Sequence, residues 1–111
     1  MRLEWRIDPE DLRRVTNELQ KALLRRARAS RGYPTTTEVC VDISMLEYKD
    51  KFSVPDVGNV RFMRGNDRLL DVGPEDRLLM YELREYVQLE LAGFGSHTGE
   101  QLGRVFKLLG I

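Results

Sequence analysis

The alternation of apolar and polar residues predicts a strand at the beginning of the chain. Leu3, Trp5 and Ile7 alternate with charged residues over positions 2–7, and this period of two is typical of a strand with one buried face. Trp5 is then a core anchor of the first strand. If its side chain is exposed instead, it is the best single candidate for a contact with a partner.

A long helix is predicted to begin directly after this strand and to run to about Ser30. Asp8 can accept hydrogen bonds from free amides of the first turn, and Pro9 has no amide to lose there. Gly32 and Pro34 end the pattern. Apolar residues at three- and four-residue steps form the predicted buried stripe, which comprises Leu12, Val15, Leu19, Ala22, Leu23 and Ala27.

The middle of the chain favours an antiparallel meander. Residues 35–46 are rich in β-branched side chains and alternate, with Val39, Val41 and Ile43 on one face. Positions 55–58 carry a Pro-Asp-Val-Gly turn signal. Two further strands are expected.

These strands, at 60–63 and 68–72, flank Gly65-Asn66, which fits a two-residue hairpin loop with glycine first.

Two amphipathic helices are predicted at the end of the chain. The first covers 75–92, after the helix-start signal Gly73-Pro74-Glu75-Asp76. Its apolar face comprises Leu79, Met80, Leu83, Tyr86, Val87 and Leu91. The second covers 97–110, where Thr98 and Gln101 have the spacing of a capping box. Its apolar stripe comprises Leu102, Val105, Phe106 and Leu109.

Together these elements predict a single α+β domain over residues 1–111. A small antiparallel sheet, formed by the N-terminal strand and the central meander, is packed by one long N-terminal helix and a C-terminal helix pair. All helices are expected on one face, so the other face or an edge of the sheet is expected to be open.

Composition fits this fold and points to an intracellular protein. The chain is 41% hydrophobic and 32% charged, with 18 basic and 18 acidic side chains. No apolar run reaches the roughly 18 residues of a membrane span, and the N-terminus has no apolar signal core. One cysteine cannot form an internal disulfide. We therefore expect a cytoplasmic location, with no membrane as partner.

The scarcity of reactive side chains argues against an enzyme. Cys40 is the one cysteine and His97 the one histidine. Cys40 is interpreted as a small buried hydrophobe between two valines, and His97 as a residue at a helix start. No metal-ligand spacing and no glycine-rich phosphate loop occurs. We expect no cofactor and no metal, and a non-enzymatic protein that binds a macromolecule as an inhibitor, adaptor or assembly subunit.

A basic face of the first long helix is the first candidate binding surface. Its members are Lys21, Arg25, Arg26, Arg28 and Arg31. Such a face suits an acidic protein partner or self-association. The alternative is a solvated surface whose basic residues complement the negative end of the helix dipole.

The C-terminal helix pair is an alternative site, for sequence-specific DNA binding by a transcriptional regulator. In a helix-turn-helix, polar residues early in the second helix contact base edges. The candidate contacts are Ser96, Thr98, Gln101, Arg104 and Lys107. The connection from Ala92 to His97 is longer than the usual turn, so a helical hairpin packed on the sheet gives the same pattern.

A metal-dependent nuclease is the third alternative. Asp42 followed by Glu47-Tyr48-Lys49 superficially resembles an acid-plus-ExK set, in which two carboxylates hold Mg²⁺ and the lysine steadies the attacking water. The odd separation of the two acids places them on opposite faces of a regular strand, so exposed charges at a strand end explain them as well.

Overall fold

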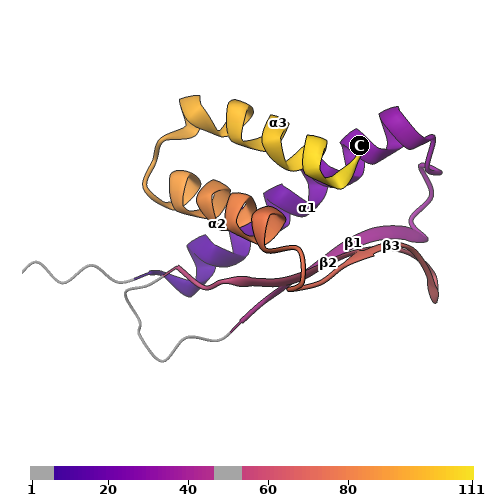
Figure 1. The fold of residues 1–111 in the computed structure, drawn as a ribbon, viewed down its shortest axis with the longest axis horizontal. Helices are drawn as coiled ribbons and strands as arrows, with labels where there is room; N and C mark the ends of the chain where they lie inside the picture. Colours follow the sequence, from indigo (N-terminus) through magenta and orange to yellow (C-terminus); the bar gives the residue numbers. More distant parts are fainter. Residues whose placement is uncertain (1–6, 47–53) are drawn as a thin grey trace, which may run out of the picture.

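The computed structural model describes residues 7–46 and 54–111 as an α+β fold with a three-stranded antiparallel sheet. The strand order is β1-β2-β3, and the helices lie on one side of the sheet (Figure 1). In chain order the elements are α1 (Pro9–Arg31), β1 (Val39–Met45), β2 (Val57–Arg64), β3 (Asp67–Val72), α2 (Arg77–Leu91), the 3₁₀ turn η1 (Gly95–His97) and α3 (Thr98–Leu109).

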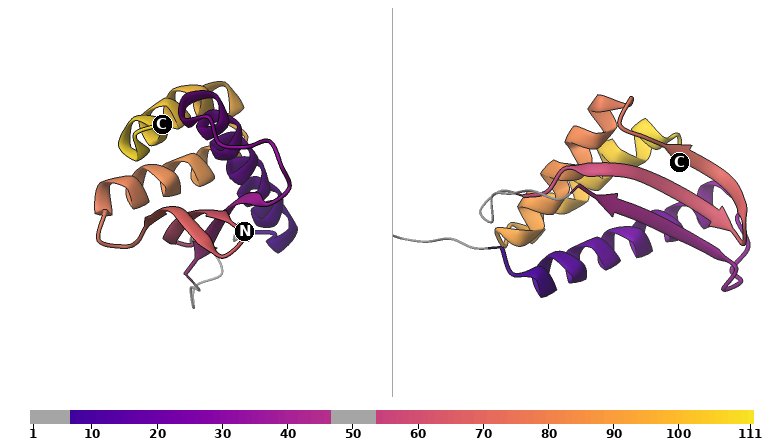
Figure 2. Two further views of the ribbon diagram at one scale, coloured as in Figure 1. Left: turned by 90° about the vertical axis from the view of Figure 1, so that its right-hand side faces the viewer. Right: turned by 90° about the horizontal axis from the view of Figure 1, so that it is seen from below.

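The helices form two levels above the sheet. α1 and α2 contact the sheet, and α3 packs on α2 on the side away from it (Figures 1 and 2). No described element crosses the opposite sheet face. The predicted arrangement of helices is therefore confirmed. The N-terminal strand predicted at 2–7 lies outside the described residues except for Ile7, which stands just before α1 and is not in a strand.

The start and the end of α1 are those that the sequence predicts. The Asp8 carboxylate accepts a hydrogen bond from the backbone N–H of Glu10 at 2.9 Å. Gly32 ends the helix in the left-handed region, with φ 67°, a conformation that favours glycine. The fully buried members of the predicted stripe are Val15, Leu19, Leu23 and Ala27.

α1 also covers the edge of β1. The side-chain carbonyl Oε1 of Gln20 accepts a hydrogen bond from the backbone N–H of Ile43 at 3.1 Å. This N–H points away from β2, so it would otherwise need water or another strand as its acceptor. The opposite edge of the described sheet, β3, is irregular: its pairing with β2 shifts between Phe62 and Met63, and Leu69 is the extra residue.

The turn predicted at 55–58 is wrong in its second half. Val57 and Gly58 belong to β2, and Val57 is buried. Gly58 sits where the β1–β2 pairing shifts, and a Cβ there would lie 3.0 Å from Ser44 Oγ and 3.1 Å from Leu46 Cδ2. Glycine allows the side chains of Ser44 and Leu46 to pack closely here, and it gives the same sequence signal as a turn. The hairpin at Gly65-Asn66 is confirmed, with φ 58° at Gly65.

One hydrophobic core joins the sheet to the helices. Phe62 at the centre of β2 is fully buried, and so are Leu79, Leu83 and Val87 of α2. α2 begins at Arg77, two residues later than predicted, because the Asp76 carboxylate caps it by accepting from the Leu79 N–H at 3.1 Å. α3 adds Val105 and Leu109 to the same core, and Ile111, just after the helix, joins them; these side chains are buried too.

The capping box predicted at the start of α3 is wrong. The Thr98 hydroxyl donates to the backbone carbonyl of Gly95 at 2.8 Å, and His97 at the cap position makes no side-chain hydrogen bond to the helix. The Gln101 amide donates to the backbone carbonyl of Glu82 at 2.8 Å and also contacts the Glu82 carboxylate. Thr98 and Gln101 therefore fasten α3 to η1 and α2, since both belong to its buried face.

Candidate partner-binding surfaces

Two arginines of the predicted basic face bind the C-terminal end of α3. The Arg26 Nε donates to the carbonyl oxygen of Ile111 at 2.9 Å, and its guanidinium carbon lies 5.3 Å from the centroid of the Phe106 ring. The Arg31 Nη2 donates to the carbonyl oxygen of Gly110 at 3.3 Å. We call these five residues the C-terminal clamp, because they hold the end of α3 against α1.

The other three members of that face differ in their polar contacts. Arg28 donates from Nε to Pro34 O at 3.2 Å and from Nη2 to Thr36 O at 3.4 Å, which fixes the connection from α1 to β1. Lys21 pairs with Glu18 at 3.8 Å. Arg25 is exposed and has no polar contact with the described residues. The face is thus largely engaged in holding the backbone of its own chain.

The structure does not bring the five candidate DNA contacts onto one exposed surface. Ser96, Arg104 and Lys107 are exposed. Thr98 and Gln101 are only 8% and 4% exposed, because they form the α3 contacts described above. Reaching a base edge with these two side chains would require unpacking α3.

The residues with reactive side chains lie apart from one another. Cys40 is exposed, so its predicted burial is wrong: it alternates with Val39 and Val41 and points to the open face of the sheet. Asp42 shares that face, while Glu47, Tyr48 and Lys49 lie outside the described residues. His97 is exposed beside Phe94, with 6.3 Å between the ring centroids. Within 7–46 and 54–111, no group of three potential metal ligands occurs.

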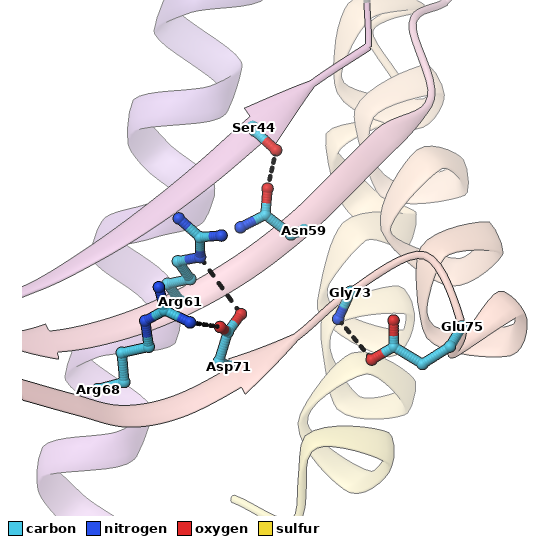
Figure 3. Close-up of polar contacts among 7 residues, drawn as sticks. All are labelled: Ser44, Asn59, Arg61, Arg68, Asp71, Gly73 and Glu75. Carbon is cyan, nitrogen blue, oxygen red and sulfur yellow. Dashed lines mark hydrogen bonds and ion pairs between the residues drawn. The ribbon is translucent and has the colours of Figure 1, made fainter.

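The open face of the sheet carries polar side chains that pair with one another (Figure 3). Asp71 accepts from Arg61 Nε at 3.3 Å and from Arg68 Nη1 at 3.1 Å. The Ser44 hydroxyl donates to the side-chain carbonyl of Asn59. These groups satisfy each other, so this face presents few polar groups that need a partner.

Sequence reasoning missed a groove between the first turns of α2 and the adjacent ends of β1 and β2. We call it the α2 groove; its volume is about 260 Å³. Apolar side chains are exposed at and beside it: Tyr81 is 58% exposed, Leu78 57% and Leu46 50%. The residues that line the groove are Leu46, Asp56, Val57, Pro74, Arg77, Met80, Tyr81 and Arg84.

Among the described residues, two arginines and one aspartate line the α2 groove. Arg84 Nη1 lies 3.1 Å from Asp56 Oδ1. The Nε of the same guanidinium is buried and has no hydrogen-bond acceptor in the structure. Arg77 is exposed and forms no ion pair with the described residues. The sequence signal for this site was weak: Leu78 and Tyr81 are apolar residues outside the predicted buried face of their helix.

The two faces of α2 differ in exposure: Tyr86 on the buried face is 4% exposed, whereas Tyr81 on the groove face is 58% exposed. Burial, together with the nearby carboxylates of Glu90 and Glu18 and against a smaller lowering by Arg14, raises the pKa of Tyr86 to about 12. Glu18 and Arg14 belong to α1. The Tyr86 side chain therefore keeps its proton to higher pH in the folded protein than in the unfolded chain.

Comparison of this chain with protein-family models, with curated proteins and with solved structures gave no match. In the part of the chain that the structure describes, no helix combines the length and the apolar character that crossing a bilayer requires.

Proposed function

We propose that the protein is a non-enzymatic binding module, of the inhibitor, adaptor or assembly-subunit kind, whose protein partner docks on the α2 groove. One observation carries the proposal: Tyr81 and Leu46 expose apolar side chains at a single groove that two guanidinium groups also line. Tyrosine and arginine are the residue types most enriched where binding energy concentrates in protein interfaces.

The open shape of the groove supports a protein partner over a small ligand. Pockets for small molecules usually enclose most of the surface of their ligand, whereas the α2 groove, with a volume of about 260 Å³, is open to solvent. It has room for one or two side chains of a larger partner, with Leu78 extending the apolar surface beside it.

This proposal moves the partner from the basic face of α1 to α2. Arg26, Arg28 and Arg31 already donate to backbone carbonyls of their own chain, so a partner on that face would compete with the fold. We place the binding in the cytoplasm, because an exposed thiol such as that of Cys40 persists best in a reducing compartment.

Site-specific photo-cross-linking tests the proposal. A photoreactive phenylalanine analogue replaces Tyr81 in one variant and Arg25 in a matched control, and the cells of origin are irradiated. We expect a defined cross-linked protein from position 81 only, lost when Leu46→Asp is added. Cross-links confined to position 25 would contradict the proposal. So would salt-dependent DNA binding that Arg104→Ala and Lys107→Ala reduce.

A further inference from the structure

We infer that the segment bound in the α2 groove carries a carboxylate next to an apolar side chain. This inference rests on the proposed function and adds the chemistry of the partner. It follows from the way in which charged and apolar side chains share the groove.

The guanidinium groups of the groove have hydrogen-bonding capacity that the fold does not use. Arg84 gives one nitrogen to Asp56; its Nε–H has no acceptor but is buried, so a bound carboxylate would meet mainly the positive charge of this guanidinium. Arg77 pairs with none of the described residues. A guanidinium binds a carboxylate with charge-assisted, often bidentate hydrogen bonds, so a carboxylate from outside matches this excess of positive charge.

The apolar part of the groove fixes where the neighbouring side chain of the partner goes. Met80 is buried, while Tyr81 and Leu46 are about half exposed. An apolar side chain placed against them would remove their exposed surface from water, which is favourable by roughly 25 cal/mol per Å². The carboxylate and the apolar side chain must therefore be close together on the bound segment.

The charges of the groove also favour a peptide carboxylate over a nucleic acid as the bound group. Among the described residues of the lining, Arg77 and Arg84 are positively charged and Asp56 is negatively charged. A nucleic acid presents regularly spaced phosphates and needs several cations along its track. One carboxylate beside an apolar side chain needs only a guanidinium next to exposed apolar side chains, and the groove contains both.

Selection from a random peptide library displayed on phage tests the inference. The folded protein is the target, and peptides that also bind Tyr81→Asp are removed. Tyr81 is exposed, so this variant should fold, which circular dichroism confirms; Leu46→Asp, also exposed, serves as a second variant. We expect enriched peptides with Asp or Glu within two positions of a large apolar residue.

Fluorescence anisotropy then measures the role of charge on one enriched peptide. Arg77→Gln should weaken its binding about tenfold, and should leave unchanged the weaker binding of the same peptide with its acid replaced by Gln or Asn. Arg25→Gln, an exposed arginine outside the groove, is the matched control and should have no effect.

The possible failures are distinguishable. Peptides that depend on Tyr81 but contain no acidic residue would overturn the inference and leave the proposed function standing. Absence of any peptide that depends on Tyr81 or Leu46 would overturn both. Self-association in sedimentation velocity that Tyr81→Asp abolishes would overturn the peptide partner, because a second copy of the chain would then occupy the groove.

Discussion

The C-terminal clamp and the α2 groove each place two arginines beside apolar side chains, yet they differ in what the guanidiniums contact. In the clamp, Arg26 and Arg31 donate to carbonyl oxygens of Ile111 and Gly110. In the groove, Arg84 keeps an N–H without an acceptor, and Arg77 stands beside exposed apolar surface. The comparison teaches that similar arginine clusters differ in how far the fold uses their donors, and this difference is the basis for proposing the α2 groove as the binding surface.

The largest expected effect tests whether the clamp belongs to the core. Ile111→Ala removes a buried side chain that packs in the main hydrophobic cluster, so the free energy of unfolding should fall by about 2–4 kcal/mol. Urea denaturation measures it. Leu108→Ala, at an exposed position in the last turn of α3, should cost less than about 1 kcal/mol. Equal losses for both would show that the end of α3 is only loosely held.

The comparison is tested most directly by the same substitution in both regions. Arg26→Met removes a hydrogen bond from a charged group and the cation–π contact with Phe106, so it should lower the free energy of unfolding by about 2 kcal/mol. Arg84→Met removes a partly exposed ion pair and an unsatisfied N–H, so its effect should stay within about 1 kcal/mol.

Binding should show the opposite order. Arg84→Met should weaken a peptide selected for the α2 groove, and Arg26→Met should leave its affinity unchanged. If both variants lost stability and both kept their affinity, the distinction between the two regions would be wrong.

The burial of Tyr86 gives a prediction about pH. Because the pKa of Tyr86 is raised from 10.0 to about 12 in the folded protein, the unfolded chain loses this proton first as the pH rises. The contribution of this proton to the free energy of unfolding is complete below pH 10 and is lost as the pH approaches 12. At pH 11 the loss is about 1.4 kcal/mol relative to pH 9, and Tyr86→Phe should lack this component in urea titrations. Tyr81→Phe, in the groove, is the matched control.

The smallest effect compares the middle of α3 with its C-terminal end. Gly103 lies inside the helix, and a Cβ there would meet nothing within 4 Å, so Gly103→Ala should stabilise the protein by about 0.5–1 kcal/mol. Gly110, in the clamp, has φ 73°, so Gly110→Ala should destabilise it by about 1 kcal/mol. Thermal unfolding resolves both changes. A gain at both positions would mean that the clamp tolerates a changed helix end.

The elements could be predicted from the sequence where local chemistry decides them. Asp8 and Pro9 mark the start of α1, and the alternation from Val39 to Ile43 gives a strand with one buried face. Local patterns gave wrong predictions where a residue packs against residues far away in the sequence. Gly58 admits the side chains of Ser44 and Leu46.

The candidate site was harder to predict, because its parts come from separate elements. The acceptor of Arg26 is a carbonyl 85 residues further along the chain, and no periodicity carries that information. The α2 groove likewise needs Leu46, Asp56 and Tyr81 to meet in space. Only the apolar character of Leu78 and Tyr81, on the polar side of their helix, was visible beforehand.

The hydrogen bond from Ile43 to Gln20 affects how molecules of this protein meet at high concentration. A foreign strand that added to β1 would have to displace the Gln20 amide and move α1 away from the sheet. At the far side, the irregular pairing around Leu69 interrupts the regular ladder that an incoming strand would extend. We therefore expect that the native protein resists fibril growth by strand addition at both edges of the described sheet, β1 and β3. At high concentration, molecules would then contact one another through their side chains.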